Sequence, residues 1–320
     1  MGCSLTARHA RAASLQRARR GGIDGASPGD DPSLWSRLPA TYNPRVPHPR
    51  KPPIALTIAG SDPSGGAGIQ ADLKTFSALA VYGASAITAI TVQNTLGVTS
   101  FRALPPDLVI AQAAAVLDDL RPAAVKLGML ANATIARALA ELFRAQPPPQ
   151  LVVDPVLVSK SGQRLLDEDA IEVVRESILP LAGVLTPNLP EAAALLDRAE
   201  GAVLADPERA CRDLAALGPR AVLLKGGHAG GAWSDDLLWD GAELLRLPAR
   251  RIGTLNTHGT GCTLSAALAA LLARGKPLHE AAREAKDYVS AAITAGADWQ
   301  LGAGQGPVHH FHAWWPEATE

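Results

Sequence analysis

Apolar and polar positions divide most of the chain into short apolar runs and longer segments with helical spacing. Six short runs predict strands, and the first of them is apolar throughout without alternation, which is typical of a strand buried on both faces. They cover residues 54–59, 85–92, 123–130, 151–156, 182–191 and 220–224. Helices are predicted over residues 69–79, 133–143 and 207–217, from Glu191 onwards, and over TLSAALAALLARG at 263–275. Residues 233–247 predict an edge hairpin.

This recurrence of strand, loop and helix predicts an α/β fold with a central, mostly parallel sheet flanked by helices. Polar side chains follow several of the predicted strands, namely Gln93, Asp154, Asn188, Glu191 and Lys225. In open α/β sheets, ligands bind at the carboxyl ends of the strands. We therefore expect these side chains to meet at one site.

The segment NTHGTGC at residues 256–262 stands directly before the last predicted helix. Gly259 and Gly261 flank Thr260, which lets the backbone turn tightly and gather several N–H groups. The first turn of a helix carries unpaired N–H groups and partial positive charge, so this turn predicts phosphate binding. Cys262 stands at its mouth, where the helix N-terminus is expected to lower the thiol pKa and suit it as a base or nucleophile. The alternative is a simple loop that leads into a core helix.

A second glycine-rich segment, GSDPSGGAG at residues 60–68, follows the first strand. It lacks the Gly-Lys-Ser/Thr ending of a Walker motif, so its glycines predict close backbone approach to a small ligand. Asp72, in the next helix, is expected to reach that ligand or to satisfy the helix dipole. Gln93 offers a donor and an acceptor, which suits a ring with an amine beside a ring nitrogen, or it is an ordinary loop amide. Met129 packs either on a flat ligand or in the core.

Composition narrows the class of protein. The 320 residues are 47% apolar, enough for a substantial core, and the net charge of −1 with only 4% aromatic residues gives no case for nucleic acid or an anionic membrane as partner. No apolar run reaches the length of a membrane span. The three cysteines, Cys3, Cys211 and Cys262, form no disulfide framework, so a reducing cytoplasm is expected.

Residues 1–50 differ from the rest. Five arginines and no acid occupy the first twenty residues, and a stretch rich in Gly, Pro, Ser and Asp follows. Such a composition buries too little apolar surface to fold, so we expect a disordered extension. The start also resembles an organelle transit peptide, and MGCSLT fits a myristoylation pattern. We favour an appended tail over both.

From Ile54 to its C-terminus, the chain resembles the bacterial hydroxymethylpyrimidine/phosphomethylpyrimidine kinases of thiamine biosynthesis, within the ribokinase-like superfamily. The resemblance rests on AGSDPSGGAGIQADLKTFSALAVYG, TVQNTLGV, KLGML, VVDPV, KSG, LTPNLPEAAALL, LLKGGH, NTHGTGCTLSAALAA and GPVHHFHAWW, which run through roughly four-fifths of the chain. It implies a single ribokinase-like domain over residues 51–320. It also implies a homodimer that uses ATP and Mg²⁺ to phosphorylate the pyrimidine's hydroxymethyl group and then the resulting monophosphate.

The resemblance also implies roles for individual residues. The transferred phosphoryl group is expected at Gly259, Thr260, Gly261 and Cys262. The pyrimidine is expected at Gln93, Gly60, Asp72 and Met129, and ATP at Asp154, Asn188, Glu191 and Lys225. Glu191 and Asp154 are expected to hold Mg²⁺ directly or through water. Cys262 replaces the Asp of most ribokinase-like sugar kinases, and Ser61 replaces a frequent Thr.

Three other functions compete with this interpretation. A pyridoxine/pyridoxal kinase of the same superfamily also acts on a flat heteroaromatic ring with a hydroxymethyl group. A non-catalytic pyrimidine-binding regulator would need neither the NxxE motif nor GTGC. A cysteine hydrolase built on Cys262 and His258 is disfavoured because the sequence shows no acid or amide partner for His258.

Two further features favour structural roles. His309, His310 and His312 near the C-terminus have no neighbouring Cys or carboxylate ligands, so a packed tail is expected in preference to a metal cluster. Cys211 lies in a predicted helix and is expected to be a small core residue.

Overall fold

The computed structural model describes residues 51–157, 168–228 and 230–315, which belong to a single unit. The expected extension at residues 1–50 and the KSG segment at 160–162 lie outside the described residues. None of the described helices combines the length and the apolar composition needed to cross a membrane.

One nine-stranded sheet organises the described residues, in the order β3-β2-β1-β4-β5-β6-β7-β8-β9. Strands β2, β1, β4, β5, β6 and β7 run parallel, whereas β3 and the β8–β9 hairpin pair antiparallel at the two edges. The strands are β1 (Ile54–Ser61), β2 (Tyr82–Asn94), β3 (Gly97–Ala103), β4 (Ala124–Leu127), β5 (Leu151–Val153), β6 (Val184–Leu185), β7 (Ala221–Leu224), β8 (Asp236–Trp239) and β9 (Leu244–Leu247).

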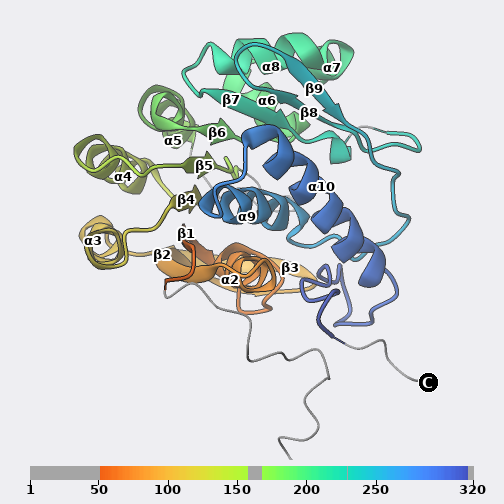
Figure 1. Ribbon diagram of the computed structural model, residues 1–320, viewed down its shortest axis with the longest axis horizontal. Helices are drawn as coiled ribbons and strands as arrows, with labels where there is room; N and C mark the ends of the chain where they lie inside the picture. Colours follow the sequence, from red (N-terminus) through yellow and green to blue (C-terminus); the bar gives the residue numbers. More distant parts are fainter. Residues whose placement is uncertain (1–50, 158–167, 229, 316–320) are drawn as a thin grey trace, which may run out of the picture. The chain divides into compact units, whose positions relative to one another are not determined.

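Helices cover both faces of this sheet, and each face has its own apolar core (Figure 1). One face carries α3 (Pro106–Asp119), α4 (Ala133–Ala145), α5 (Glu168–Val173), α6 (Leu189–Leu196), α7 (Glu200–Ala205) and α8 (Pro207–Ala215). A π-helical turn, Val174–Ile178, and a 3₁₀ turn, Leu179–Leu181, follow α5, and a 3₁₀ turn at Gly226–His228 follows β7. The other face carries α2 (Gly68–Ala78), α9 (Thr260–Ala273) and α10 (Leu278–Ala295).

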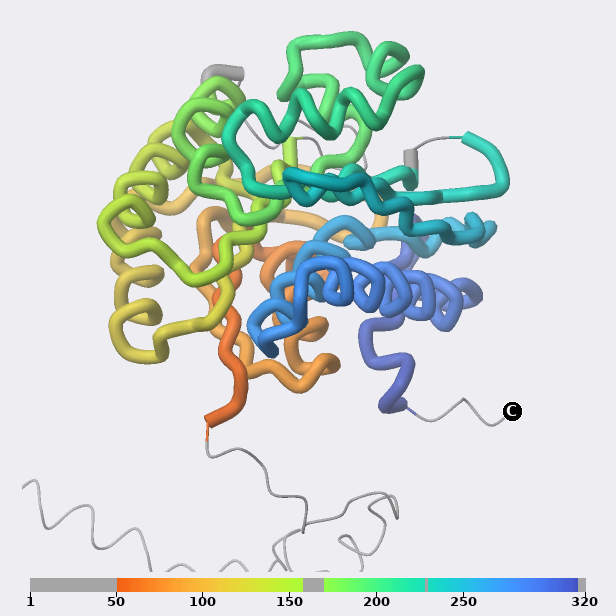
Figure 2. Tube along the Cα trace, turned by 45° about the horizontal axis from the view of Figure 1, so that its top comes forward, coloured from red at the N-terminus to blue at the C-terminus, as the bar shows by residue number. Residues whose placement is uncertain are grey.

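Helix α9 lies against the sheet, with α2 and α10 packed against it (Figures 1 and 2). Its residues 263–272 are all buried, which matches a sequence that is rich in small and apolar residues on every side. The helix therefore holds its N-terminus rigidly against the carboxyl edge of the sheet.

The predicted α/β architecture is confirmed, including all six parallel strands and the β8–β9 edge hairpin. Strand β3 and helices α3, α5, α7 and α10 were not predicted. Strand β3 is largely exposed at the sheet edge and alternates weakly, so its sequence lacks the apolar run that marks the central strands.

Candidate active site

Two glycine-rich segments meet at the carboxyl edge of the sheet. We call residues 62–67 the β1–α2 loop and residues 256–261 the α9 turn. Gly259 precedes α9 with a left-handed φ of 74°, and a Cβ on it would lie 1.7 Å from the carbonyl oxygen of Gly66. Only glycine fits this contact, so the two segments are locked together backbone to backbone.

Asp62 organises the β1–α2 loop from within. Its carboxylate accepts hydrogen bonds from the backbone N–H groups of Ser64 (2.8 Å), Gly66 (3.2 Å) and Ala67 (2.8 Å). His258 of the α9 turn places its Nε2 2.8 Å from Asp62 Oδ2. Burial acts to raise the pKa of Asp62, but the bonds from His258 and Ser64 outweigh it and lower that pKa to about 2.

His258 also contacts the residue expected to read the pyrimidine, since its Nε2 lies 3.2 Å from the side-chain amide of Gln93. The expectation that His258 has no acid or amide partner is therefore wrong. Asp62 lies 196 residues away and Gln93 lies 165 residues away along the chain, so only the fold brings the three together.

Gly60 and Met129 lie side by side, as a shared pocket requires. A Cβ on Gly60 would stand 3.0 Å from Met129 Sδ. The carbonyl oxygen of Met129 accepts a 2.6 Å hydrogen bond from the hydroxyl of Thr88. The backbone that carries Met129 is thereby fixed next to the end of β1.

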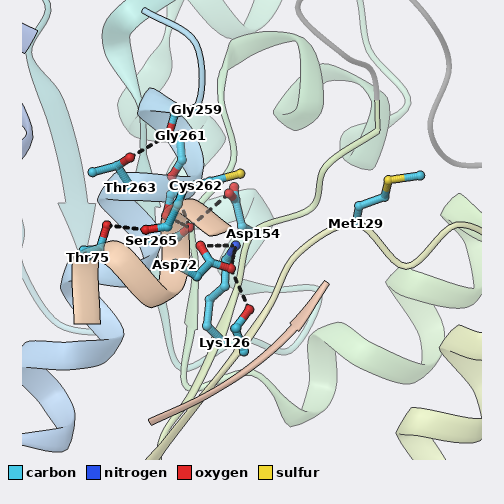
Figure 3. Close-up of polar contacts among 12 residues, drawn as sticks. Asp72, Thr75, Lys126, Met129, Asp154, Gly259, Gly261, Cys262, Thr263 and Ser265 are labelled. Atoms are coloured by element: carbon cyan, nitrogen blue, oxygen red, sulfur yellow. Dashed lines mark hydrogen bonds and ion pairs between the residues drawn. The ribbon is translucent and has the colours of Figure 1, made fainter. Parts of the chain in front are cut away.

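Asp72 is fully buried and already bonded on both oxygens (Figure 3). Lys126 Nζ lies 3.0 and 2.9 Å from its two oxygens, and the Thr57 hydroxyl donates to Oδ2 at 2.5 Å. Burial alone would lower the pKa of Lys126, but the Asp72 carboxylate raises it above its ordinary value. The Asp72 side chain thus supports Lys126 beneath the site, and its contact with a ligand stays a prediction.

Asp154 and Lys225 form the charged centre of the site. Lys225 Nζ donates to Asp154 Oδ1 at 2.7 Å, and the Ser265 hydroxyl of α9 donates to Asp154 Oδ2 at 3.0 Å. A Cβ on Gly261 would lie 3.2 Å from Lys225 Nζ. The first turn of α9 therefore converges on this ammonium.

Asn188 and Glu191 begin helix α6 as a capping box. The Asn188 side chain accepts from the Glu191 N–H at 2.8 Å, and Glu191 Oε2 accepts from the Asn188 N–H at 2.8 Å. Glu191 Oε2 also lies 3.7 Å from Lys225 Nζ. Burial raises the pKa of Glu191 to about 7, although Lys225 acts to lower it. The NxxE motif is thus a structural cap whose acid also faces the charged centre.

Cys262 lies in the first turn of α9, but its electrostatics differ from the prediction. Burial raises the pKa of its thiol to about 11, although Lys126 and the backbone N–H of Gly68 act to lower it. The expected depressed pKa is therefore wrong for the unliganded site. The reason is that desolvation of the thiolate, together with the carboxylates of Asp72 and Asp154, outweighs Lys126 and the Gly68 N–H.

Thr260, the remaining residue expected around the phosphoryl group, lies in the α9 turn and its hydroxyl donates to the Thr257 carbonyl at 2.7 Å.

The C-terminal histidines pack as a tail, as expected. His310 is buried and lies 3.1 Å from the Thr263 hydroxyl of α9, while the His309 ring stands 4.2 Å from that of Trp299. Cys211 is a fully buried core residue.

The oxygens near Lys225 fit a hard divalent cation. Asp154 and Glu191 are both buried and face the same ammonium, and oxygen ligands are those that Mg²⁺ prefers. Among the described residues, a separate group that satisfies metal-ligand spacing is Asp240, Glu243 and His279, which are half-buried to exposed. The C-terminal histidines are not part of that group.

Sequence reasoning missed four residues that the fold brings to the site: Asp62, Lys126, His258 and Ser265. A signal existed for two of them, because Lys126 is a charge within a buried strand and Ser265 is a hydroxyl within an apolar helix. For Asp62 and His258, nothing in the local sequence identifies their partners.

Comparisons with known proteins identify the family of the chain. The family model for phosphomethylpyrimidine kinase matches residues 62–309. A hydroxymethylpyrimidine/phosphomethylpyrimidine kinase from Rhizobium meliloti is 54% identical, over 82% of this chain and 99% of its own.

Two solved structures show the same fold. Staphylococcus aureus pyridoxal kinase in complex with AMP-PCP and pyridoxal has a TM-score of 0.74 at 36% identity, covering 82% of this chain and 94% of its own. Phosphomethylpyrimidine kinase from Clostridium difficile 630 has a TM-score of 0.66 at 42% identity, covering 75% and 99%.

Proposed function

The chain belongs to the phosphomethylpyrimidine kinase family, and we propose that it phosphorylates 4-amino-5-hydroxymethyl-2-methylpyrimidine with ATP and then phosphorylates the monophosphate. The diphosphate would serve thiamine biosynthesis. The observation that carries the proposal is the convergence of the α9 turn on Lys225, with Gly261 in contact range of the ammonium. Backbone N–H groups and a cation at one point suit a transferring phosphoryl group.

Phosphoryl transfer requires alignment and charge stabilisation more than covalent chemistry. Gly259, Thr260 and Gly261 would surround the phosphoryl group, and Lys225 would offset the charge on its oxygens. The hydroxymethyl oxygen forms the new P–O bond while the bond to the ADP oxygen breaks. The fixed α9 turn would hold the acceptor and donor oxygens in line.

We propose Cys262 as the base that takes the hydroxymethyl proton. Only its thiolate can accept this proton, so the thiol must first lose its own proton to solvent, and at pH 7 the thiolate is a small fraction because burial raises the pKa to about 11. Lys126 and the Gly68 N–H are in place to stabilise the thiolate when it forms. Both groups already face the sulfur and would lower the free energy of the thiolate. Because the thiolate fraction grows with pH, activity should rise with pH.

Asp154, Asn188 and Glu191 would bind the nucleotide side together with Lys225. Glu191 and Asp154 would hold Mg²⁺ directly or through water, and the bound ion would neutralise charge on the ATP phosphates. Both Asp154 oxygens already accept hydrogen bonds, from Lys225 and Ser265, which favours a water-mediated contact for this acid.

Gln93, Gly60, Met129 and Asp72 would form the pyrimidine side. Gln93 lies near the carboxyl end of β2, and Gly60 and Met129 are in contact range of each other. The polarizable thioether of Met129 would contact the face of a flat ring.

The exposed face of the β2–β3 hairpin supports a homodimer. Ile90, Val92 and Leu96 are 45%, 58% and 68% exposed on this edge of the sheet, which is more apolar surface than an edge strand ordinarily presents. Light scattering after size exclusion should give twice the chain mass for wild type and a monomer for Val92→Glu.

Cys211 and Cys262 are free thiols, which fits our proposal that the enzyme works in a reducing cytoplasm.

The decisive assay compares ATP-dependent phosphorylation of the hydroxymethylpyrimidine, its monophosphate and pyridoxal, in wild type and Cys262→Ala. Turnover of both pyrimidines that collapses in the variant is expected. Turnover of pyridoxal alone would move the protein to the pyridoxal kinases, whose fold it shares. Binding without turnover of any of the three would indicate a regulator.

A further inference from the structure

The side chain of Gln93 lies between two polar groups, and the other contacts of each group decide whether it donates or accepts a hydrogen bond toward Gln93. Its Nε2 is 3.2 Å from His258 Nε2, and its Oε1 is 3.2 Å from the Thr91 hydroxyl. Gln93 and Thr91 are two residues apart on β2, so their side chains point to the same face of the strand. The hydrogen-bonding roles of these two neighbours decide which way the amide points.

His258 must donate from Nε2. Its partner, Asp62 Oδ2 at 2.8 Å, is an ionised carboxylate that also accepts from the N–H groups of Gly66 and Ala67. An ionised carboxylate has no proton to give, so the proton of this contact resides on His258 Nε2. This holds for the neutral Nε2–H imidazole and for the imidazolium alike.

Thr91 must accept from Gln93. A hydroxyl has one proton, and Thr91 Oγ1 lies 2.8 Å from the carbonyl oxygen of Ser61, which can only accept. The proton of Thr91 is therefore used, and its oxygen is left to accept a hydrogen bond from Gln93.

With Nε2 toward His258, the amide N–H of Gln93 faces the N–H of His258, so two donors oppose each other. At the same time, Gln93 Oε1 faces the Thr91 oxygen, so two acceptors oppose each other. A 180° turn of the amide, which exchanges Oε1 and Nε2, resolves both conflicts, because the single N–H at His258 Nε2 is then shared between two acceptors, Asp62 Oδ2 and Gln93 Oε1. We propose that His258 and Thr91 hold Gln93 with its oxygen toward His258 and its nitrogen toward Thr91, and that this lock makes the site select a 4-aminopyrimidine over its 4-oxo analogue.

The preference for the 4-amino ring follows from the donor and acceptor of Gln93 that His258 and Thr91 do not occupy. One lone pair of Oε1 and one N–H of Nε2 remain for a ligand. A 4-aminopyrimidine presents an amine donor beside a ring-nitrogen acceptor, which matches them with the amine on the His258 side. The 4-oxo analogue presents an acceptor beside an N–H donor, so its bonding requires the turned amide that His258 and Thr91 oppose. Sites that leave buried polar groups unpaired discriminate by roughly 100-fold or more.

The inference rests on the proposed function, because it assumes that Gln93 reads the ring. His258 and Thr91 are positioning residues here, and they act through Gln93. His258 is also the residue directly before Gly259, and its N–H donates to the Gly306 carbonyl at 3.0 Å. The lock is therefore anchored to the same backbone that forms the α9 turn.

The test compares kcat/KM for the 4-amino substrate and its 4-oxo analogue in wild type, His258→Gln and His258→Met. Glutamine keeps an N–H donor near the position of Nε2, whereas methionine removes it. We expect a wild-type preference of at least about 100-fold, kept in His258→Gln and reduced tenfold or more in His258→Met. Thr91→Ser and Thr91→Val form a second matched pair, with relaxed preference expected only for valine.

An equal loss for both substrates in His258→Met, with the preference intact, would overturn the inference. If a variant lacks turnover, calorimetry with the two ring analogues that lack the hydroxymethyl group gives the same ratio as binding constants. Retained ADP binding would show that the variant is folded.

Nitrogen-15 NMR of histidine-labelled protein gives a readout that does not depend on activity, with His258→Gln identifying the signal. A protonated Nε2 at pH 7 is expected, and an unprotonated Nε2 would overturn the lock. Wild-type enzyme that fails to phosphorylate either pyrimidine would refute the proposed function and leave this NMR result unchanged, so the two failures are distinguishable.

Discussion

The ammonium of Lys225 lies 2.7 Å from the carboxylate of Asp154, although strand β6 separates the strands from whose ends these residues come. Both side chains are nearly buried, with Lys225 at 8% and Asp154 at 2% exposure. Glu191 and the first turn of α9 face the same ammonium. A single cation thus joins three separate segments at the carboxyl edge of the sheet.

Replacing Lys225 should therefore harm both stability and activity. In Lys225→Met, Asp154 and Glu191 remain as buried, unpaired carboxylates, so we expect a loss of about 3–5 kcal/mol in unfolding free energy. ATP turnover should also disappear. Denaturant unfolding and a coupled ADP assay measure the two effects.

A double variant separates them. Lys225→Met with Asp154→Asn should regain much of the stability but no activity, because the charge is balanced while the phosphate partner is missing. Lys276→Met removes ion pairs with the exposed acids Glu280 and Glu284 and serves as the surface control, which should change stability only slightly and leave activity unchanged. Full activity in Lys225→Met would exclude its proposed role.

The Cys262 thiol should react slowly at neutral pH. Because burial raises its pKa to about 11, alkylation by iodoacetamide should be roughly 100-fold slower at pH 8 than for an exposed cysteine and should rise about tenfold per pH unit. Cys3→Ser/Cys211→Ala protein confines the reaction to Cys262.

Lys126→Met in the same background should slow the alkylation further, since it removes the cation that stabilises the thiolate. The raised pKa also means that the folded state favours the protonated thiol. Its contribution to stability is therefore present below about pH 9 and is lost as the pH rises toward 11. Rapid alkylation at pH 7 would contradict this picture.

Gly259→Ala should abolish folding of the α9 turn. The new Cβ would lie 1.7 Å from the Gly66 carbonyl oxygen, and the residue would have to keep a φ of 74°. Gly275→Ala is the matched control, because Gly275 has a φ of 81° but no atom within 4 Å of the added Cβ. We expect a loss of about 1–2 kcal/mol for Gly275→Ala from backbone strain alone and a much larger fall in melting temperature for Gly259→Ala. Similar melting temperatures for the two variants would show that the backbone contact is unimportant.

Asp62 should contribute to stability at moderate pH and lose that contribution in acid. Its folded pKa of about 2 lies below the ordinary 3.8, so the folded state favours the carboxylate. The stabilisation is present above about pH 4 and is lost as the pH falls through 2. In Asp62→Asn, the difference from wild type in unfolding free energy should shrink steadily between pH 4 and pH 2. A constant difference over this interval would mean that the Asp62 charge is not used.

The sequence by itself determined the fold class and most of the central sheet. Strands buried on both faces leave continuous apolar runs, so β1 and β4 to β7 were predictable, whereas the exposed β3 left no such mark. The motifs around Gly259 and Asn188 also identified the family, because long stretches of specific residues matched it. The roles of the individual site residues remain predictions that the proposed variants test.

Only the tertiary structure decided the electrostatics of the site. Whether Cys262 is acidic depends on the balance between burial and the charge of Lys126, and that balance arises from residues more than a hundred positions apart. The same holds for Asp62, His258 and Gln93, which meet through β1, β2 and the α9 turn. Local sequence sets backbone conformation and burial pattern, but the pKa of a group and the orientation of an amide depend on the atoms around it, which the folded chain alone supplies.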